Sequence, residues 1–131
     1  MTDTESCIII GAGIAGLLAG QHLMRYDLDV TIIEKSRGFG GRMAVKSLGE
    51  AVFDAGAQFM TTRDMIFRER VETWLSKKEV RPWYAGPLRN MRYVGTGGMT
   101  DVPSRIGKSL NVRLSERATR VAFTDDQWEV T

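Results

Sequence analysis

Three glycines and one glutamate stand at a spacing that can hold a nucleotide. Gly11, Gly13 and Gly16 form the pattern GxGxxG, and Glu34 follows roughly twenty positions later. In such a site the first glycine permits a tight turn, the second lets the backbone approach a diphosphate, and the third lets a helix pack closely. Free amides at the start of that helix face the anion. Glu34 would accept hydrogen bonds from both ribose hydroxyls and repel a 2′-phosphate, so FAD and NAD are allowed and NADP is disfavoured.

These four residues need a strand, a helix and a second strand to position them. Ser6–Ile10 is an apolar run that ends at glycine, which predicts a buried parallel strand rather than an alternating one. Asp29–Glu34 predicts a second strand. A helix begins near Ile14, and Ala19, together with Gly16, should let it pack close to the strands. Its apolar face is formed by Ile14, Leu17, Leu18 and Leu23. The result is a βαβ unit with a right-handed crossover.

The uncharged run from Ser6 to Met24 has about the length of a membrane helix. Four glycines crowd it, and no basic residue precedes it, as a secretory signal would require. We therefore predict no membrane partner and a cytoplasmic chain. A net charge of +2 with scattered basic residues also predicts no nucleic-acid partner. The single cysteine, Cys7, cannot form an internal disulfide.

The stretch after Glu34 helps to distinguish the two allowed cofactors. An NAD-binding unit would continue into another helix and strand, but the chain reads KSRGFGGRMAVKSLGEAVFDAGAQFMTT, which is glycine-rich and lacks a helical period. Met43–Leu48 and Ala51–Asp54 instead predict two strands joined by a tight turn at Gly49 and Glu50.

At these residues the sequence resembles the flavin-containing amine oxidases, and especially their renalase-like branch. The resemblance rests on GxGxxG, on GGRM at residues 40–43 and on DAGAQF at residues 54–59, and it runs from Ser6 through Val121. It implies an α/β fold: a Rossmann-like FAD-binding βαβ unit with a glycine-rich loop and added β-hairpin strands, incomplete relative to the full family fold. FAD is the implied cofactor.

The resemblance also implies roles for residues outside the glycine pattern. Arg42 would reach the FAD diphosphate, and Ala57, Gln58 and Phe59 would lie beside the flavin ring. Arg42 could instead be a solvated loop cation and Gln58 a polar core residue. Phe59 stands where many relatives have tyrosine. The predicted cofactor-binding residues are Gly11, Ala12, Gly13, Ala15, Gly16, Glu34, Lys35, Gly41, Arg42, Met43, Ala57, Gln58, Phe59 and Val121.

No side chain is predicted to be catalytic or to bind a metal. The only histidine, His22, has no carboxylate or cysteine partner in the pattern. This does not argue against an enzyme, because a flavin would carry the redox chemistry while the protein holds and polarises it.

The middle of the chain predicts a structural helix and, after it, a second group of candidate site residues. Asp64–Lys77 is an amphipathic helix with Thr62 or Asp64 at its start. Its apolar stripe is Ile66, Phe67, Val71, Trp74 and Leu75. Arg89–Val94 predicts a short strand, and the following GTGGM loop enters a helix marked by Val102, Ile106 and Leu110. Gly97, Gly98 and Met99 are candidates for a pocket wall, and Trp83, Tyr84 and Tyr93 either line a flat substrate's site or pack between sheet and helix.

The final residues predict three short strands, Asn111–Leu114, Arg117–Thr124 and Gln127–Thr131. In enzymes of the resembled kind, the strand holding Val121 joins the nucleotide sheet and its backbone meets the adenine. Those enzymes continue into a substrate domain, so we expect an amino-terminal portion that self-associates or pairs with the missing carboxyl-terminal part. The expected regions are residues 1–60 for the βαβ unit and flavin loop, 61–110 for the start of the substrate side, and 111–131 for further strands of the nucleotide domain.

Two functions follow. The first is an FAD-dependent oxidoreductase that takes a hydride from a small-molecule substrate, either an amine or a reduced nicotinamide-type molecule, and passes electrons to oxygen. The second is a nucleotide-binding fragment that holds FAD or NAD without turnover.

Overall fold

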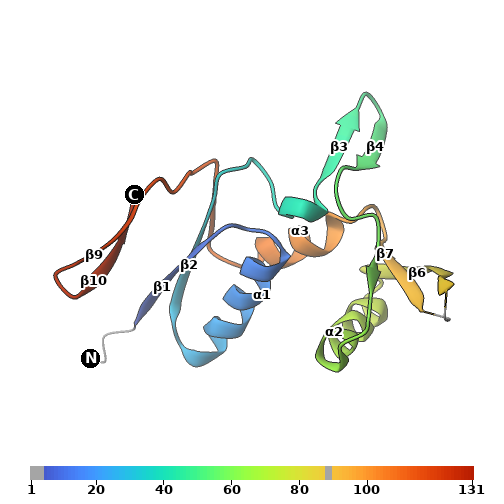
Figure 1. The fold of residues 1–131 in the computed structure, drawn as a ribbon, viewed down its shortest axis with the longest axis horizontal. Coiled ribbons are helices and arrows are strands. Elements are labelled where there is room, and N and C mark those ends of the chain that lie inside the picture. Colours follow the sequence, from blue (N-terminus) through green and yellow to red (C-terminus); the bar gives the residue numbers. More distant parts are fainter. Residues whose placement is uncertain (1–4, 88–89) are drawn as a thin grey trace. The chain divides into compact units, whose positions relative to one another are not determined.

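A computed structural model describes residues 5–87 and 90–131 and shows a mixed α/β chain (Figure 1). The chain divides into two compact units. Unit 1 comprises Met1–Gly41 and Pro103–Thr131, and unit 2 comprises Arg42–Val102. Each unit has its own sheet, so each is described by itself.

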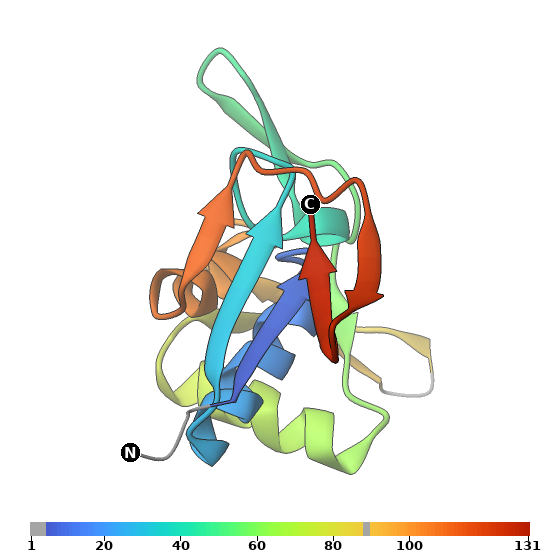
Figure 2. The ribbon, with the colours of Figure 1, turned by 90° about the vertical axis from the view of Figure 1, so that its left-hand side faces the viewer.

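The sheet of unit 1 contains three parallel strands. β1 (Ser6–Ile10) pairs with β2 (Asp29–Glu34), and β2 pairs with β8 (Val112–Leu114), in the order β1-β2-β8 (Figure 2). α1 (Ile14–Leu23) and the short 3-10 helix η1 (Met24–Tyr26) connect β1 to β2. The predicted strand, glycine turn, helix and strand are confirmed, and β2 has the predicted bounds.

Close packing of α1 on the sheet depends on glycine rather than alanine. Leu17 and Gly20 are buried in α1, and a Cβ at Gly20 would lie 2.9 Å from Cδ1 of the fully buried Ile32. Ala19 is exposed, so the prediction that it mediates this approach is wrong. Gly20 is four residues beyond Gly16 and lies on the same helix face, so it is Gly20 that lets α1 approach the sheet closely.

β1 is parallel, as predicted, but it is not buried on both faces. Its exposure alternates, with Ile8 44% and Ile10 55% exposed, whereas Cys7 and Ile9 are half-buried. A Cβ at Gly16 of α1 would lie 3.3 Å from the Ile9 side chain, so Ile9 faces the helix. The prediction of a fully buried strand is wrong because α1 covers one face of β1, and Ile8 and Ile10 point to the other.

The last two strands of unit 1 form a separate hairpin. β9 (Val121–Thr124) and β10 (Gln127–Val130) pair only with each other among the described strands. The prediction that the strand holding Val121 joins the nucleotide sheet is therefore wrong, and β8 joins it instead. Ser115 has a φ of 61°, which ends the extended backbone of β8. Arg117–Arg120 consequently precede β9 instead of forming its first half.

Unit 2 begins with the 3-10 helix η2 (Gly41–Met43), whose first residue still belongs to unit 1, and a β-hairpin. β3 (Val45–Leu48) and β4 (Ala51–Asp54) are antiparallel, with Leu48 opposite Ala51. Gly49 has a φ of 60°, which suits the tight turn between them. The predicted hairpin is confirmed, with β3 starting two residues later than expected.

The other strands of unit 2 form an antiparallel sheet in the order β5-β7-β6. They are β5 (Met60–Thr61), β6 (Val80–Ala85) and β7 (Met91–Gly95). The strand predicted at Arg89–Val94 corresponds to β7, while Arg89 lies outside the described residues. Pro82 lies in β6, an edge strand of this sheet, and edge strands tolerate proline.

Two helices complete the chain. α2 (Met65–Ser76) begins where predicted, because the Asp64 side chain accepts a hydrogen bond of 2.9 Å from the Phe67 N–H. Val71 and Trp74 are buried, as the predicted apolar stripe requires. Ile66 is 79% exposed, so its predicted place on that stripe is wrong. The second helix, α3 (Asp101–Lys108), contains the unit boundary and buries Val102 and Ile106; Leu110 lies beyond its end. Within the described residues, no helix has both the length and the apolar character needed to cross a membrane.

Candidate nucleotide-binding site

The three glycines of the opening turn have three different structural reasons to be glycine. Gly11 has a φ of 104°, a conformation that side chains disfavour, and its N–H donates a 2.8 Å hydrogen bond to the Ile33 carbonyl. A Cβ at Gly16 would lie 2.1 Å from the Gly11 carbonyl oxygen, so only glycine fits there. A Cβ at Gly13 would meet nothing within 4 Å. The space in front of Gly13 is open, as the approach of a ligand to the backbone requires.

The start of α1 is suited to an anion. Gly13 is the N-cap, no side chain caps the helix, and the first turn holds no acidic residue. The first amides of a helix have no intrahelical acceptor, and the helix dipole adds partial positive charge there. Ala12, fully buried, and Ala15, exposed in the first turn, lie beside this start. These residues fit the diphosphate of a nucleotide.

Glu34 points at the glycine turn from the end of β2. Its Oε2 accepts a 2.8 Å hydrogen bond from the Ala12 N–H, and its Oε1 accepts one of 2.8 Å from the Ser36 N–H. Glu34 is 7% exposed. Burial by itself raises the pKa of Glu34, but the hydrogen bonds from Ala12 and Ser36 outweigh it and hold this pKa below the ordinary value. The carboxylate is therefore ionised at neutral pH and keeps lone pairs for further donors.

A second glycine pair supports the turn from the other side. The Gly40 N–H donates a 3.0 Å hydrogen bond to the Ala12 carbonyl, and Gly40 forms a bridge with Gly13. Gly40 and Gly41 have φ values of 114° and 54°, and a Cβ at Gly41 would lie 3.4 Å from the Gly13 Cα. In unit 1 the two glycines thus pack backbone against backbone and fix the shape of the glycine turn.

A cavity of about 260 Å³ lies next to Gly11 and Glu34. It is lined by Ile10, Gly11, Ile33, Glu34, Lys35, Glu116, Arg117 and Ala118. The Glu116 N–H donates a 3.0 Å hydrogen bond to the Glu34 carbonyl, which holds the segment after β8 against the end of β2. Of the predicted site residues, Gly11, Glu34 and Lys35 line this cavity. Sequence reasoning missed Glu116, Arg117 and Ala118, because only the turn at Ser115 brings them back to β2.

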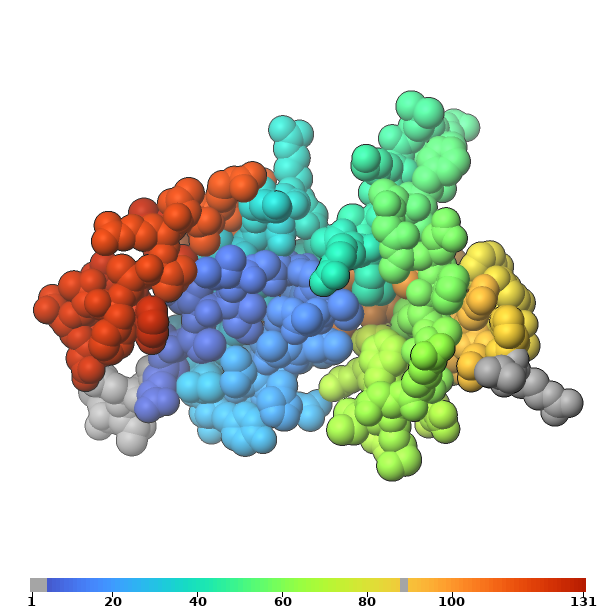
Figure 3. All heavy atoms as spheres, viewed as in Figure 1, coloured from blue at the N-terminus to red at the C-terminus, as the bar shows by residue number. Residues whose placement is uncertain are grey.

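Val121 lies elsewhere in unit 1. It lines a different cavity, of about 640 Å³, together with β1 residues such as Ile8 and Ile10 and with Trp128 of β10. The space-filling view shows the β9–β10 hairpin, in red, beside the blue β1 (Figure 3). Val121 is therefore not brought to the cavity that Glu34 lines.

The remaining predicted residues lie in unit 2, where two glycine-containing segments are locked together. The Arg42 carbonyl accepts a 2.8 Å hydrogen bond from the Ala57 N–H, and a Cβ at Gly56 would lie 2.0 Å from that carbonyl oxygen. The Met43 carbonyl accepts a 3.0 Å hydrogen bond from the Thr100 hydroxyl. The Arg42 side chain is exposed. The backbone hydrogen bond between Ala57 and Arg42 thus joins the GGRM segment to the DAGAQ segment.

Gln58 and Phe59 follow Ala57 directly in the sequence and also belong to unit 2. Gln58 lines a cavity of about 480 Å³ together with Gly98 and Trp83. The Phe59 ring lies 6.2 Å from the Trp83 ring. Met99 is fully buried, and its N–H donates a 3.0 Å hydrogen bond to Asp54 Oδ1, so it packs in the core instead of forming a cavity wall.

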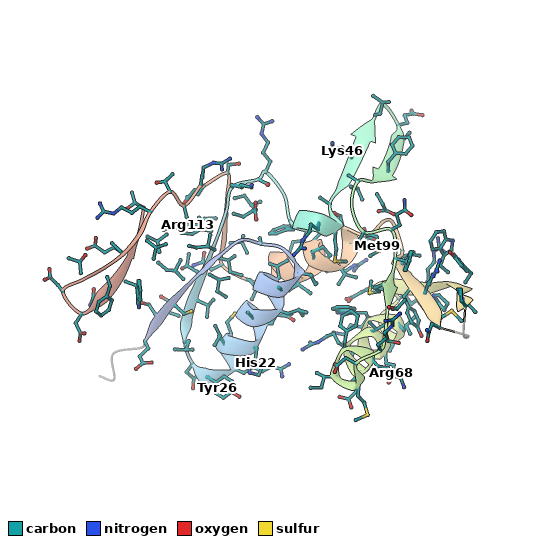
Figure 4. All side chains as sticks on the ribbon, in the orientation of Figure 1. His22, Tyr26, Lys46, Arg68, Met99 and Arg113 are labelled. Carbon is teal, nitrogen blue, oxygen red and sulfur yellow. The ribbon has the colours of Figure 1, made fainter. Side chains whose placement is uncertain are left out.

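The side chain of His22 lies against an aromatic ring. It lies at the end of α1 with its ring 5.3 Å from that of Tyr26, and both are labelled in Figure 4. Within the part of the chain that the structure describes, no group of histidine, cysteine and acidic side chains could hold a metal ion.

The parallel β1–β2 pair, the glycine turn and the acid at the end of β2 define a Rossmann-like nucleotide-binding fold. The comparison with protein families agrees, since residues 9–71 match the family described as NAD(P)-binding Rossmann-like domain. Together with the strand pairing, this match assigns a Rossmann-like nucleotide-binding fold to the chain.

Individual relatives are much longer than the part they share with this chain. Hydroxyneurosporene desaturase of Rubrivivax gelatinosus is 39% identical over 67 residues, which are 49% of this chain and 13% of the relative. A 4,4′-diapophytoene desaturase (4,4′-diapolycopene-forming) of Methylomonas sp. is 32% identical over 90 residues, 64% of this chain and 18% of the relative. This chain thus matches less than a fifth of the length of either.

A solved structure extends the likeness over nearly the whole chain. Thermovibrio ammonificans THI4 superposes with a TM-score of 0.59 at 20% identity and covers 98% of this chain and 45% of that chain. At this identity the likeness shows the fold alone.

Proposed function

We propose that this chain is the nucleotide-binding part of an FAD-dependent oxidoreductase of the renalase-like and amine-oxidase kind. One observation carries the proposal: open space in front of Gly13 and an ionised Glu34 meet at the same glycine turn. The relatives named as desaturases support a redox enzyme. The GGRM and DAGAQF segments support FAD over NAD through the resemblance described above.

Residues of unit 1 would bind the ADP half of the cofactor. The backbone amides at Gly13, Ala15 and Gly16 face the diphosphate, and Glu34 accepts the ribose hydroxyls. The cavity beside Glu34 would take the adenine, between Lys35 and the Arg117–Ala118 backbone. This assigns to Ala118 the adenine contact that the sequence suggested for Val121.

Residues of unit 2 would serve the flavin half. Arg42 and Met43, next to Gly41, are the proposed contacts of the diphosphate side, and Ala57, Gln58 and Phe59 those of the flavin ring. This assignment rests on the resemblance, and the backbone bond between Ala57 and Arg42 supports a common role for the two segments.

When bound, FAD would take a hydride from a small amine or a reduced nicotinamide-type molecule and pass the electrons to oxygen. The protein's own contribution is to hold the cofactor. The amides of α1 hold its negative charge, Glu34 fixes the sugar, and the glycine pair Gly40 and Gly41 keeps the turn rigid. No side chain of the chain is assigned a proton-transfer role.

The second candidate is a nucleotide-binding module without turnover of its own. It needs only the binding of a nucleotide at the glycine turn, which is the part of the proposal that the geometry supports directly. Anaerobic addition of an amine or of a dihydronicotinamide to the FAD-loaded chain separates the two functions. Bleaching of the flavin absorbance supports the enzyme, and an unchanged flavin spectrum with both substrates supports the module.

Titration calorimetry with FAD, ADP, NAD and NADP tests the binding claim that both functions share. We expect FAD and ADP to bind and NADP to bind at least tenfold more weakly than NAD, because an ionised Glu34 repels the 2′-phosphate. Equal affinity for NAD and NADP, or no binding of ADP, would refute the assignment of this site.

A further inference from the structure

Three exposed apolar side chains of unit 2, those of Val52, Phe53 and Trp83, line a cavity of about 480 Å³. Its lining residues are Val52, Phe53, Asp54, Gln58, Arg81, Trp83, Val94, Gly95 and Gly98. Trp83 is 47% exposed and Phe53 56%. A volume of this size suits a small molecule, and exposed apolar side chains among polar ones commonly mark a binding site.

Trp83 is held in place by its neighbours. Its ring contacts the Tyr84 ring edge-on, with centroids 4.8 Å apart and planes at 73°. Behind this pair, the Arg92 guanidinium lies 4.3 Å above the Phe59 ring and 4.6 Å above the Tyr84 ring, and it donates a hydrogen bond to the Tyr84 hydroxyl. Trp83 thus belongs to an aromatic cluster and keeps exposed ring surface, on which an aromatic ligand can stack.

The charges around the cavity favour an anion. Arg81 precedes Trp83 by two residues in β6, and within residues 5–87 and 90–131 it makes no ion pair. Asp54 is the one acid in the lining, but its Oδ1 already accepts the Met99 N–H at 3.0 Å. Arg92 adds a second positive charge behind the aromatic side chains. Two guanidinium groups thus stand against the single carboxylate of Asp54, and the planar fork of Arg81, which is the one in the lining, matches a carboxylate.

We infer that this cavity binds a flat aromatic carboxylate, with its ring on Trp83 and its carboxylate on Arg81. All the lining residues belong to unit 2, so this binding needs neither the glycine turn nor Glu34.

Three ligands with the same ring and different charges test the inference on the full chain. These are 3-phenylpropionate, phenethylamine and 3-phenylpropanol, titrated by calorimetry with and without ADP. We expect 3-phenylpropionate to bind at least tenfold more tightly than the other two. A preference for phenethylamine would overturn the inference in favour of an amine site at Asp54, and no binding of any of the three would overturn it altogether.

Two variants and two matched controls locate the site. Arg81→Ala should remove the preference for the carboxylate, and Trp83→Ala should weaken all three ligands at least fivefold. The exposed Arg63 in unit 2 and the 68%-exposed Trp128 in unit 1 supply the controls Arg63→Ala and Trp128→Ala, which should bind like the parent chain.

Circular dichroism verifies that each variant is folded, and ADP affinity reports on the nucleotide site separately. If the folded Arg81→Ala chain keeps the carboxylate preference, the inference is wrong. If ADP binding fails while 3-phenylpropionate still binds, the proposed nucleotide function fails alone.

Discussion

At the scale of single residues, Gly13 and Gly16 allow function and stability to be separated. Gly13 has extended backbone angles and open space at its Cβ position, whereas a Cβ at Gly16 would lie 2.1 Å from the Gly11 carbonyl. Gly13→Ala should therefore keep or slightly raise stability, since it restricts the unfolded chain, and should weaken ADP binding at least tenfold. Gly16→Ala should lower the free energy of unfolding by about 1–3 kcal/mol, as overpacking does. Urea denaturation and calorimetry check both.

The two glycine variants serve as controls for each other. A Gly13→Ala chain that binds ADP like the parent would show that the diphosphate does not approach this backbone. A Gly16→Ala chain of unchanged stability would show that α1 can shift away from the Gly11 carbonyl without lowering the free energy of unfolding.

Glu34 gives a prediction about pH. Its pKa is lower in the folded chain than the ordinary value of 4.5, so the folded state binds this proton less well than the unfolded state. The stability that Glu34 contributes is then fully present above about pH 4.5 and is lost as the pH falls through the folded-state pKa. Urea denaturation of the parent chain and of Glu34→Gln should differ most at pH 7, by about 1–3 kcal/mol, and should converge at acid pH.

The exposed Glu129 of β10 provides the matched control. Glu129→Gln removes the same charge from unit 1 without removing a hydrogen bond among the described contacts, so its stability should follow that of the parent chain at every pH. A constant difference between Glu34→Gln and the parent from pH 7 to pH 3 would contradict the role given to ionised Glu34.

At the scale of elements, β8 and the segment after it form one side of the cavity proposed for the adenine. Arg117 lines the cavity beside Glu34, and Val121 lines another. Arg117→Ala should weaken ADP binding about two- to thirtyfold if its side chain, and not only its backbone, lies over the adenine, because a guanidinium over an aromatic ring contributes about 0.5–2 kcal/mol. Val121→Ala should leave ADP binding unchanged, and calorimetry with ADP compares the two. If Val121→Ala weakens ADP binding and Arg117→Ala does not, the adenine contact would instead belong to β9.

The elements also show where sequence reasoning succeeds. β2 and the β3–β4 hairpin were predictable because each ends at a residue with a local reason to end it, such as Gly49 with its φ of 60°. α2 was predictable from its cap at Asp64. The glycine turn and the place of Glu34 were predictable because the first strand, the helix, the second strand and the spacing of the acid all agree.

Other features depend on contacts between distant segments. The break between β8 and β9 depends on Ser115, a non-glycine residue with a positive φ that no sequence pattern announces. The contact of Arg117 and Ala118 with the end of β2 needs the hydrogen bond from Glu116 to Glu34, which joins segments far apart in the chain. The exposure of Ile8 and Ile10 depends on which face α1 covers, and composition does not reveal this.

At the scale of the whole molecule, β1 is an edge strand whose outer face is apolar. No described strand pairs with it on the side away from β2, and Ile8, Ile10 and Trp128 are 44%, 55% and 68% exposed around the adjacent cavity of about 640 Å³. An open edge with apolar neighbours favours strand pairing between molecules. We therefore expect the 131-residue chain to associate as its concentration rises, which light scattering coupled to size exclusion measures directly.

Ile8→Lys tests whether β1 is the surface involved. A lysine on an edge strand opposes pairing by its charge, and Ile8 is exposed enough to be replaced without opening the core. The variant should remain monomeric over the concentration range in which the parent chain associates. Met65→Lys, at an exposed position in α2, adds the same charge in unit 2 and should leave the association unchanged. A parent chain that is monomeric at all concentrations, or association that both variants reduce equally, would mean that the edge of β1 does not drive it.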